Sequence, residues 1–224
     1  MKAYAETLDG MVDAQLKSET RRRRQLGNPL RYRLAKRSVD LVFLVAALPA
    51  LVICCLVLPV ANRVWNPGPL FFVQTRMGRY GKPFRMIKFR TMVAAADRGR
   101  GHDDPLETGR ITRLGTMLRT YRIDELPNII NIARGQMTLV GPRPDMFDHA
   151  TVYCRTVPHY DRRLEVTPGI TGMAQVMNGY ADDGNLVRRK AAYDRAYVQM
   201  ASFGLDMFIL RRTVLVVLKG FGAR

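Results

Sequence analysis

The sequence has little cysteine, little histidine and few acidic residues, and each shortage excludes a class of protein. Its three cysteines, Cys54, Cys55 and Cys154, are too few and too unevenly spaced for a disulfide framework or a zinc site, which fits a reducing, cytosolic environment. The three histidines are dispersed and lack the spacing of metal ligands. Because 36 lysines and arginines face 19 acidic residues, the formal charge is +17. A field of that sign favours nucleic acid, an anionic membrane surface or a phosphorylated substrate as partner.

Internal repeats are missing, and we expect no cleavable signal peptide, because the first long apolar run begins only near Leu41. A length of 224 residues with 47% hydrophobic content suffices for one domain, or for a domain with a membrane element. Residues 1–34 are polar and contain Arg21-Arg22-Arg23-Arg24. We expect a basic arm there, which either lies on an anionic membrane surface or is simply solvated.

The run from Leu41 to Ala61 carries no charge and is the main membrane signal. At about 1.5 Å of rise per residue it is long enough to cross a hydrocarbon core of about 30 Å, so an ordinary transmembrane helix is one interpretation. Pro49 argues against a straight helix, because it removes a backbone hydrogen bond in mid-run. Basic residues crowd both flanks, and the positive-inside bias places both on the cytoplasmic side. We therefore predict a re-entrant membrane helix over residues 35–62 that bends at Pro49, and a cytosolic domain over residues 63–224.

Two short extended segments follow the membrane run. Residues 70–74 and 84–89 have the composition of strands and are separated by glycine and proline, which predicts a small β-hairpin with a basic tip. Lys88 and Arg90 alternate with apolar residues, so in a strand they would share one face and could grip a diphosphate. A solvated edge strand is the alternative.

The most informative stretch lies between residues 118 and 145. An adjacent carboxylate pair, Asp124 and Glu125, follows Arg119 and Arg122 and precedes Pro142-Arg143-Pro144. A carboxylate can attack phosphorus or hold Mg²⁺, and guanidinium groups can stabilise the charge that develops, so this combination suits phosphate chemistry. The alternative is that the pair merely opens a helix, where acidic residues are favoured in the first turn.

The remaining segments predict helices with short connections. The pattern favours helices over residues 112–121 and 128–134, a short extended piece over 138–140, a helix or two between 145 and 166, a turn at 168–172, a helix ending near 202 and an apolar segment over 205–218. Arg211 and Arg212 interrupt this last segment, which suits an interfacial or a core helix. The polar residues 97–110 indicate a loop.

Seven segments, taken in order, give the chain a recognisable signature. They are Lys36-Arg37-x-x-Asp40, Gly68-Pro69-Leu70-Phe71-Phe72, Lys88-Phe89-Arg90-Thr91-Met92, Ile111-Thr112-Arg113-Leu114-Gly115, Asp124-Glu125-Leu126-Pro127-Asn128, Leu139-Val140-Gly141-Pro142-Arg143-Pro144 and Pro168-Gly169-Ile170-Thr171-Gly172-Met173-Ala174-Gln175. Each segment alone is a weak signal, but together they are specific. Across roughly residues 35–220 the chain resembles the bacterial sugar transferases, the monotopic polyprenyl-phosphate phosphoglycosyl transferases.

The resemblance implies an activity and its participants. Such enzymes move a phosphosugar from a UDP-sugar to a polyprenyl phosphate, typically undecaprenyl phosphate, and release UMP through a covalent aspartyl-phosphosugar intermediate. They initiate the synthesis of exopolysaccharide, capsule, O-antigen or glycoconjugates. They act at the bacterial inner membrane, with the catalytic domain on the cytoplasmic face. The implied fold is α+β and mainly helical, with an N-terminal re-entrant membrane helix, a small β-hairpin and interfacial amphipathic helices around an active site at the membrane surface.

The same resemblance implies the site residues. Asp124 is the nucleophile, and Glu125 helps to hold the Mg²⁺ cofactor. Four cations are expected near phosphate groups: Lys88, Arg90, Arg119 and Arg143. At the helix break, Leu48-Pro49 replaces the Ser-Pro that the family usually has. The proline is kept, but a serine hydroxyl that could bond a freed carbonyl is lost.

Other partners and other functions follow from the charge and the apolar helices. Anionic membrane lipids fit the basic flanks, and the apolar helices are compatible with a homodimer. A membrane-anchored, basic nucleic-acid-binding protein is one alternative, but the cations are spread through the chain and no nucleic-acid motif is present, so we expect no nucleic-acid partner. The other alternative is an aspartyl-phosphate phosphatase, in which water replaces the lipid acceptor.

Overall fold

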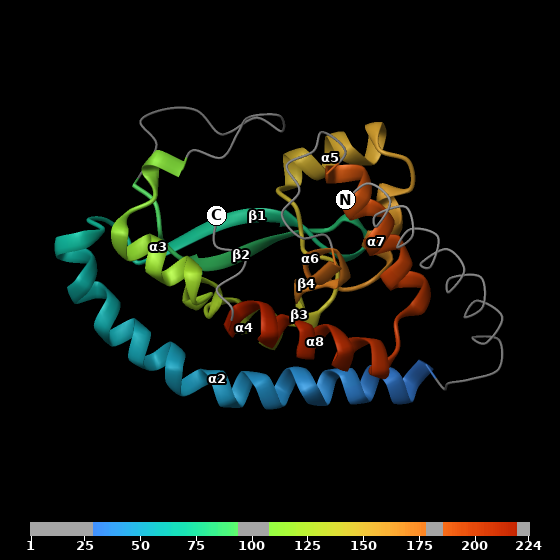
Figure 1. The fold of residues 1–224 in the computed structure, drawn as a ribbon, viewed down its shortest axis with the longest axis horizontal. Helices are drawn as coiled ribbons and strands as arrows, with labels where there is room; N and C mark the ends of the chain where they lie inside the picture. Colours follow the sequence, from blue (N-terminus) through green and yellow to red (C-terminus); the bar gives the residue numbers. More distant parts are fainter. Residues whose placement is uncertain (1–28, 94–107, 178–185, 219–224) are drawn as a thin grey trace.

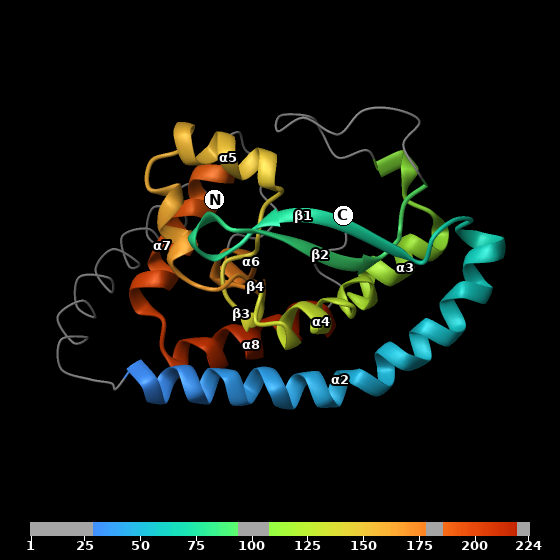
Figure 2. The ribbon, with the colours of Figure 1, turned by 180° about the vertical axis from the view of Figure 1, so that it is seen from behind.

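The computed structural model describes residues 29–93, 108–177 and 186–218, and this part of the chain is mainly helical with two small sheets. One long helix, α2 (Pro29–Trp65), runs along one side, and the other described elements gather above it in both views (Figures 1 and 2). The basic arm expected over residues 1–34 lies mostly outside the described residues. Its last part belongs to α2, which begins before the predicted residue 35 and ends after residue 62.

The other elements follow the sequence pattern closely. Strands β1 (Phe71–Met77) and β2 (Pro83–Phe89) form the predicted antiparallel hairpin, and β3 (Thr138–Val140) pairs in parallel with β4 (Gly169–Thr171). The helices are α3 (Arg113–Thr120), α4 (Asn128–Ala133), α5 (Phe147–Thr156), α6 (Met173–Met177), α7 (Leu186–Met200) and α8 (Phe203–Leu218). Short 3₁₀ turns lie at Arg79–Gly81, Thr108–Arg110, Ile123–Glu125 and Tyr160–Glu165.

The apolar run forms the central part of α2. Pro49 and Pro59 both lie inside the helix, and an interior proline is a usual cause of a bend. Figures 1 and 2 show the C-terminal half of the helix curving toward α3. Among the described helices this one is long and apolar enough to cross a membrane, with a mean hydropathy of 3.1 over its most apolar window, and 17% of that window is buried. Such low burial is not that of a core helix.

Polar residues in the first half of α2 fasten the helix to the rest of the molecule. Asp40 is buried and accepts hydrogen bonds from Thr138 Oγ1 at 2.9 Å and from the backbone N–H of the next residue at 2.8 Å. Lys36 Nζ donates to Val140 O at 2.6 Å and lies 2.7 Å from Asp206 Oδ2. The basic and acidic residues just before the apolar run therefore tie α2 to β3 and α8.

The predicted turn at 168–172 is wrong, because Gly169–Thr171 forms strand β4 beside β3. Its glycine explains the close pairing: a Cβ at Gly169 would lie 2.1 Å from the backbone nitrogen of Gly141. Only a residue without a side chain lets the two backbones approach this closely. The strand therefore depends on a contact with a segment far away in the sequence.

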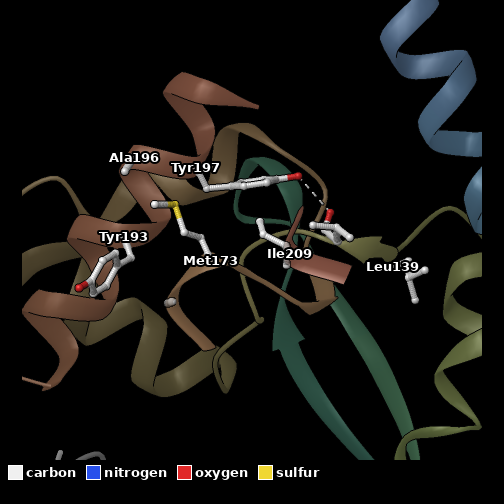
Figure 3. Close-up of a cluster of buried hydrophobic side chains, with 8 residues drawn as sticks. Leu139, Met173, Tyr193, Ala196, Tyr197 and Ile209 are labelled. Carbon is white, nitrogen blue, oxygen red and sulfur yellow. Dashed lines mark hydrogen bonds between the residues drawn. The ribbon is translucent and has the colours of Figure 1, made fainter. Parts of the chain in front are cut away.

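The main core packs α6, α7 and α8 against β3. Tyr197 lies beside Met173 and Ile209 in this cluster, and its hydroxyl points toward β3 (Figure 3). That hydroxyl donates to Asp206 Oδ1 at 2.8 Å and contacts Val140 O at 3.2 Å, so the buried polar atom is satisfied. Helix α8 is thus a core helix on this face, while its opposite face exposes large apolar side chains, namely Phe203, Phe208, Val214 and Leu215.

Candidate active site

Three segments bring the carboxylate pair together with cations. Helix α3 is capped by Thr112, whose Oγ1 accepts from the Gly115 N–H at 2.9 Å. After α3 the chain passes through Arg122 in the left-handed region, at φ 58°, and this reversal starts the turn that carries Asp124 and Glu125. Strand β2 supplies a lysine to this turn, and the β3–β4 connection supplies an arginine.

Glu125 is buried at the centre of this cluster. Arg143 approaches its carboxylate with both terminal nitrogens, Nη1 at 3.0 Å from Oε2 and Nη2 against Oε1. Lys88 Nζ lies 3.3 Å from Oε1, and Arg122 Nη1 lies 3.7 Å from the same oxygen. Burial alone would raise the pKa of Glu125, but the three cations outweigh it and hold that pKa well below its ordinary value. Glu125 is therefore ionised at neutral pH.

Asp124 is buried beside it but is bonded differently. Its Oδ1 has no hydrogen-bond partner among the described residues. Burial, and then the neighbouring Glu125 carboxylate, raise the pKa of Asp124, while Lys88 and Arg143 oppose the rise. Arg119 is close enough for Asp124 to raise its pKa, although burial has the larger, opposite effect. Asp124 thus presents a carboxylate oxygen that is not engaged by a donor, as a nucleophile or a metal ligand requires.

The cations around the pair also have shifted pKa values. Burial lowers the pKa of Lys88 to about 8, although Glu125 acts in the opposite direction. Burial would also lower the pKa of Arg143, but its contact with Glu125 raises that pKa above the ordinary value. Arg119 donates from Nε to Thr91 Oγ1 at 2.9 Å, which fixes it between α3 and the end of the hairpin. Three of the four residues predicted to bind phosphate, Lys88, Arg119 and Arg143, therefore lie at the carboxylate pair.

Arg90 lies elsewhere. Strand β2 ends at Phe89, so Lys88 and Arg90 do not continue along one strand face as expected. The Arg90 guanidinium is buried, with Nε donating to Pro69 O at 2.8 Å and Nη2 donating to Asn66 O. These contacts close the turn that follows α2. The structure therefore does not bring this predicted phosphate-binding residue to the carboxylate pair.

Two further arginines lie at the site, although neither is among the predicted site residues. Arg122 stands just before the pair, but its left-handed backbone, which turns it toward Glu125, is not visible in the sequence. Arg76 lies in β1, and burial together with Arg143 lowers its pKa to about 10. It resembles any strand arginine in the sequence, so no local signal could have marked it.

The two adjacent carboxylates are the groups at this site that could hold a divalent cation. Within residues 29–93, 108–177 and 186–218, no group of three or more His, Cys, Asp and Glu side chains is placed to hold a metal. Magnesium is typically held by one or two carboxylates together with substrate phosphates and water. Asp124 with its unpartnered oxygen, and Glu125 beside it, fit that pattern when a diphosphate completes the coordination. Glu125 would then share its oxygens with Arg143 and Lys88.

Known proteins resemble this chain over most of its length. Residues 31–220 match the family model described as Bacterial sugar transferase. The chain belongs to the bacterial sugar transferase family. Among its relatives, the UDP-N-acetylgalactosamine-undecaprenyl-phosphate N-acetylgalactosaminephosphotransferase of Aeromonas hydrophila is 36% identical over 100% of this chain and 53% of its own length. The UDP-glucose:undecaprenyl-phosphate glucose-1-phosphate transferase of Caulobacter vibrioides is 42% identical over 81% of this chain and 68% of that relative.

A third relative is matched over nearly its whole length. The exopolysaccharide production protein PSS of Rhizobium leguminosarum bv. phaseoli is 35% identical over 83% of this chain and 98% of its own length. By contrast, the chain spans about half the length of the Aeromonas relative, at 53%. Family membership and the exposed apolar face of α2 together indicate membrane association.

Proposed function

We propose that this protein transfers a phosphosugar from a UDP-sugar to a polyprenyl phosphate, specifically undecaprenyl phosphate, and releases UMP, as a step in exopolysaccharide or related glycoconjugate synthesis. Relatives named for this type of transfer support the proposal. The observation that carries it is the unpartnered Asp124 oxygen within a cluster that has more cations than anions. Two carboxylates face four cations there: Lys88, Arg119, Arg122 and Arg143. The positive excess suits a diphosphate.

The first step uses the chain's own groups. An Asp124 carboxylate oxygen attacks the sugar-bearing phosphorus of the donor, forming an oxygen–phosphorus bond. The bond between that phosphorus and the bridging oxygen breaks, and UMP leaves with the electron pair. Lys88 and Arg143 stabilise the charge on the phosphoryl oxygens, as preorganised donors do in phosphoryl transfer. Magnesium held by Asp124 and Glu125, when bound, supplies further neutralisation of phosphate charge.

The second step restores the enzyme. An oxygen of the polyprenyl phosphate attacks the same phosphorus, the bond to Asp124 breaks, and the polyprenyl-diphosphate sugar is formed. The acceptor phosphate is already anionic, so the second step needs no general base. Two successive displacements let a water-soluble donor and a membrane-bound acceptor use one site in turn.

The membrane arrangement that we propose is re-entrant, at the inner membrane, with the site at the cytoplasmic interface. The bend in α2, its two internal prolines and the basic residues on both flanks support it. Leu48 stands where the family usually has a serine, so the two internal prolines alone would produce the bend. Exposed apolar side chains of β1, Phe71, Phe72 and Val73, and of α8 support an interfacial position for those elements. The basic arm would lie on anionic lipids.

Single cysteines test this topology. Ser38 and Arg63 are exposed near the two ends of α2, so each is replaced by cysteine in a background without Cys54, Cys55 and Cys154. A membrane-impermeant maleimide should label both positions in inverted vesicles and neither in right-side-out vesicles. Labelling of the two positions from opposite sides would show a spanning helix and would contradict the re-entrant arrangement.

Turnover tests the activity itself. The protein in lipid nanodiscs with undecaprenyl phosphate and Mg²⁺ is offered a panel of UDP-sugars, and UMP and lipid-linked sugar are measured together. At least one donor should give both products in equal amounts. Free sugar phosphate as the main product would indicate the phosphatase alternative. Salt-dependent retention of DNA without turnover of any donor would indicate the nucleic-acid alternative.

A further inference from the structure

The segment that carries Arg143 is held by its carbonyl groups. Four consecutive carbonyls, from residue 142 to residue 145, each accept a hydrogen bond from a distant part of the chain. Two of the donors are backbone groups: Gly169 N donates to Pro142 O at 3.0 Å, and Met77 N donates to Asp145 O at 3.1 Å. Pro142 and Pro144 have no N–H, so their carbonyls are the only backbone groups through which these two residues can form hydrogen bonds.

The other two donors are arginine side chains from two different elements. Arg163 Nη2 donates to Arg143 O, and Arg76 Nη1 donates to Pro144 O at 3.1 Å. Arg163 comes from the 3₁₀ turn Tyr160–Glu165, and Arg76 comes from β1. Two guanidinium groups from different elements therefore hold the peptide units on the C-terminal side of Arg143.

Arg163 is itself immobilised, and its own surroundings balance its charge. It is 4% exposed, and Nη1 donates to Asp145 Oδ2 and to Tyr160 OH, the latter at 2.9 Å. Its Nη2 lies 3.0 Å from Asp194 Oδ2 on α7, and Lys190 pairs with Asp145. Two carboxylates thus face two cations in a buried network behind the segment. Arg163 does not need Glu125 or a substrate for neutralisation.

Arg76 is bonded more sparsely. Nη2 donates to Gln74 Oε1 on the same strand, and the buried Nε has no hydrogen-bond partner among the described residues. Among the described residues, no carboxylate lies within ion-pair distance of Arg76. Its hydrogen bond to Pro144 O is therefore its direct bond to the segment that carries Arg143.

We propose that Arg163 and Arg76 are positioning residues that set the guanidinium of Arg143 at the reacting phosphates without touching the substrate. The inference rests on the proposed function, because the consequence is expressed in donor turnover. Neither residue contacts Glu125 in the described structure, so both act through the backbone that carries Arg143. Misplacement of a phosphate-binding group by about 1 Å can cost about 100-fold in rate.

A double-mutant cycle on kcat/KM tests this dependence. Arg163→Gln and Arg76→Gln should each lower UMP release by roughly 10- to 100-fold in the otherwise wild-type protein. In an Arg143→Gln background the same changes should cost less than about threefold more, because there is no longer a guanidinium to position. The midpoint of thermal unfolding, by contrast, should fall by the same amount in both backgrounds for each change. Arg163→Lys keeps one donor and the buried charge, and should recover part of the loss.

Arg162→Gln is the matched control, because Arg162 neighbours Arg163, is 58% exposed and pairs with Glu165 instead. Its kcat/KM should equal that of the wild type. If Arg163→Gln fails to fold, Arg76→Gln decides the question, since Arg76 lies outside the buried acidic network. Equal fold-losses with and without Arg143, or full activity of both glutamine variants, would overturn the inference. Absence of turnover in the wild-type protein would contradict the proposed function instead.

Discussion

Arg143 and Glu125 form a two-point ion pair, in which Nη1 of the arginine lies 3.0 Å from Oε2 of the glutamate and Nη2 contacts Oε1. The two parallel contacts fix the plane of the guanidinium as well as its distance. About a quarter of the Arg143 side chain, 24%, stays exposed. A group oriented by its carboxylate partner and still open on one side can receive a phosphate without reorganisation.

Replacing Arg143 should therefore impair catalysis strongly. Arg143→Gln is expected to lower kcat of UMP release by about 10²- to 10³-fold, the usual effect of removing one charge-stabilising donor. Arg143→Lys should recover only part of it, because an ammonium group cannot reproduce the two-point contact. Arg134→Gln, an exposed arginine at the end of α4, is the control. Wild-type kcat in Arg143→Gln would remove this residue from the mechanism.

Glu125 is expected to affect both the stability of the protein and the Mg²⁺ dependence of its activity. Glu125→Gln leaves Lys88 and Arg143 without their anion, so the free energy of unfolding should fall by about 1–3 kcal/mol, and half-maximal activity should need more Mg²⁺. The folded-state pKa of Glu125 lies below the unfolded value of 4.5. The stabilisation is thus fully present above pH 4.5 and is lost as the pH falls through the folded pKa.

The measurement for Glu125 is thermal unfolding of the wild type and the variant from pH 7 down to pH 3. The difference in midpoint should shrink as the pH falls. The exposed Glu165→Gln serves as control and should show a small, nearly constant difference. An undiminished gap at pH 3 would mean that ionisation of Glu125 does not carry the effect.

The lowered pKa of Lys88 predicts that activity depends on pH. Its pKa of about 8 lies below the ordinary 10.5, so its positive charge is present at neutral pH and is lost above pH 8. The profile of kcat/KM should therefore fall on its alkaline side with an apparent pKa near 8. Lys88→Arg should move that fall to higher pH. The exposed lysine of the same hairpin gives the control Lys82→Met, which should leave the profile unchanged.

Asp40 anchors the apolar helix to the strand before Arg143. Asp40→Ala removes a carboxylate that accepts from Thr138 Oγ1 and from the following backbone N–H, so unfolding should become easier by about 1.5–3 kcal/mol. Arg33→Gln, an exposed change on the same helix, should not alter the midpoint of denaturation in detergent. Equal midpoints for the two variants would show that the anchor contributes nothing measurable.

Close backbone contact makes Gly169 irreplaceable. A Cβ at Gly169 would lie 2.1 Å from Gly141 N, so Gly169→Ala should prevent the pairing of β3 with β4 and yield little folded protein. At Gly204, in α8, a Cβ meets nothing within 4 Å, and Gly204→Ala should fold normally. Size-exclusion profiles and far-UV circular dichroism compare the two. A well-folded Gly169→Ala would show that the strands can separate.

Local pattern was enough for most of the fold. The spacing of apolar residues located α3, α4, α7 and α8, and the glycine–proline break located the hairpin, because these elements follow from short-range periodicity. Strand β4 was missed, because it exists only through pairing with a segment about thirty residues earlier. The start of α2 was placed too late, since polar residues before the apolar run gave no helical signal by composition.

The site residues that local pattern predicted also differ from those that depend on distant contacts. Asp124, Glu125 and Arg143 were found because acid, cation and rigid turn stand close together in the sequence, and the structure brings them together. Arg90 was predicted from its alternation with apolar residues beside Lys88, but the strand ends one residue earlier, and the Arg90 guanidinium closes a turn instead. Arg76 acts through a backbone carbonyl of a distant segment, and such an acceptor has no mark in the sequence.

The central claim is that Asp124 carries the sugar phosphate between donor and acceptor. The direct measurement is mass spectrometry of the protein quenched after incubation with its UDP-sugar and Mg²⁺ in the absence of polyprenyl phosphate. The account predicts release of about one UMP per enzyme and a sugar-phosphate mass added to the peptide containing residue 124, with neither in Asp124→Asn. UMP release that begins only when the lipid acceptor is added, with no adduct on that peptide, would contradict it.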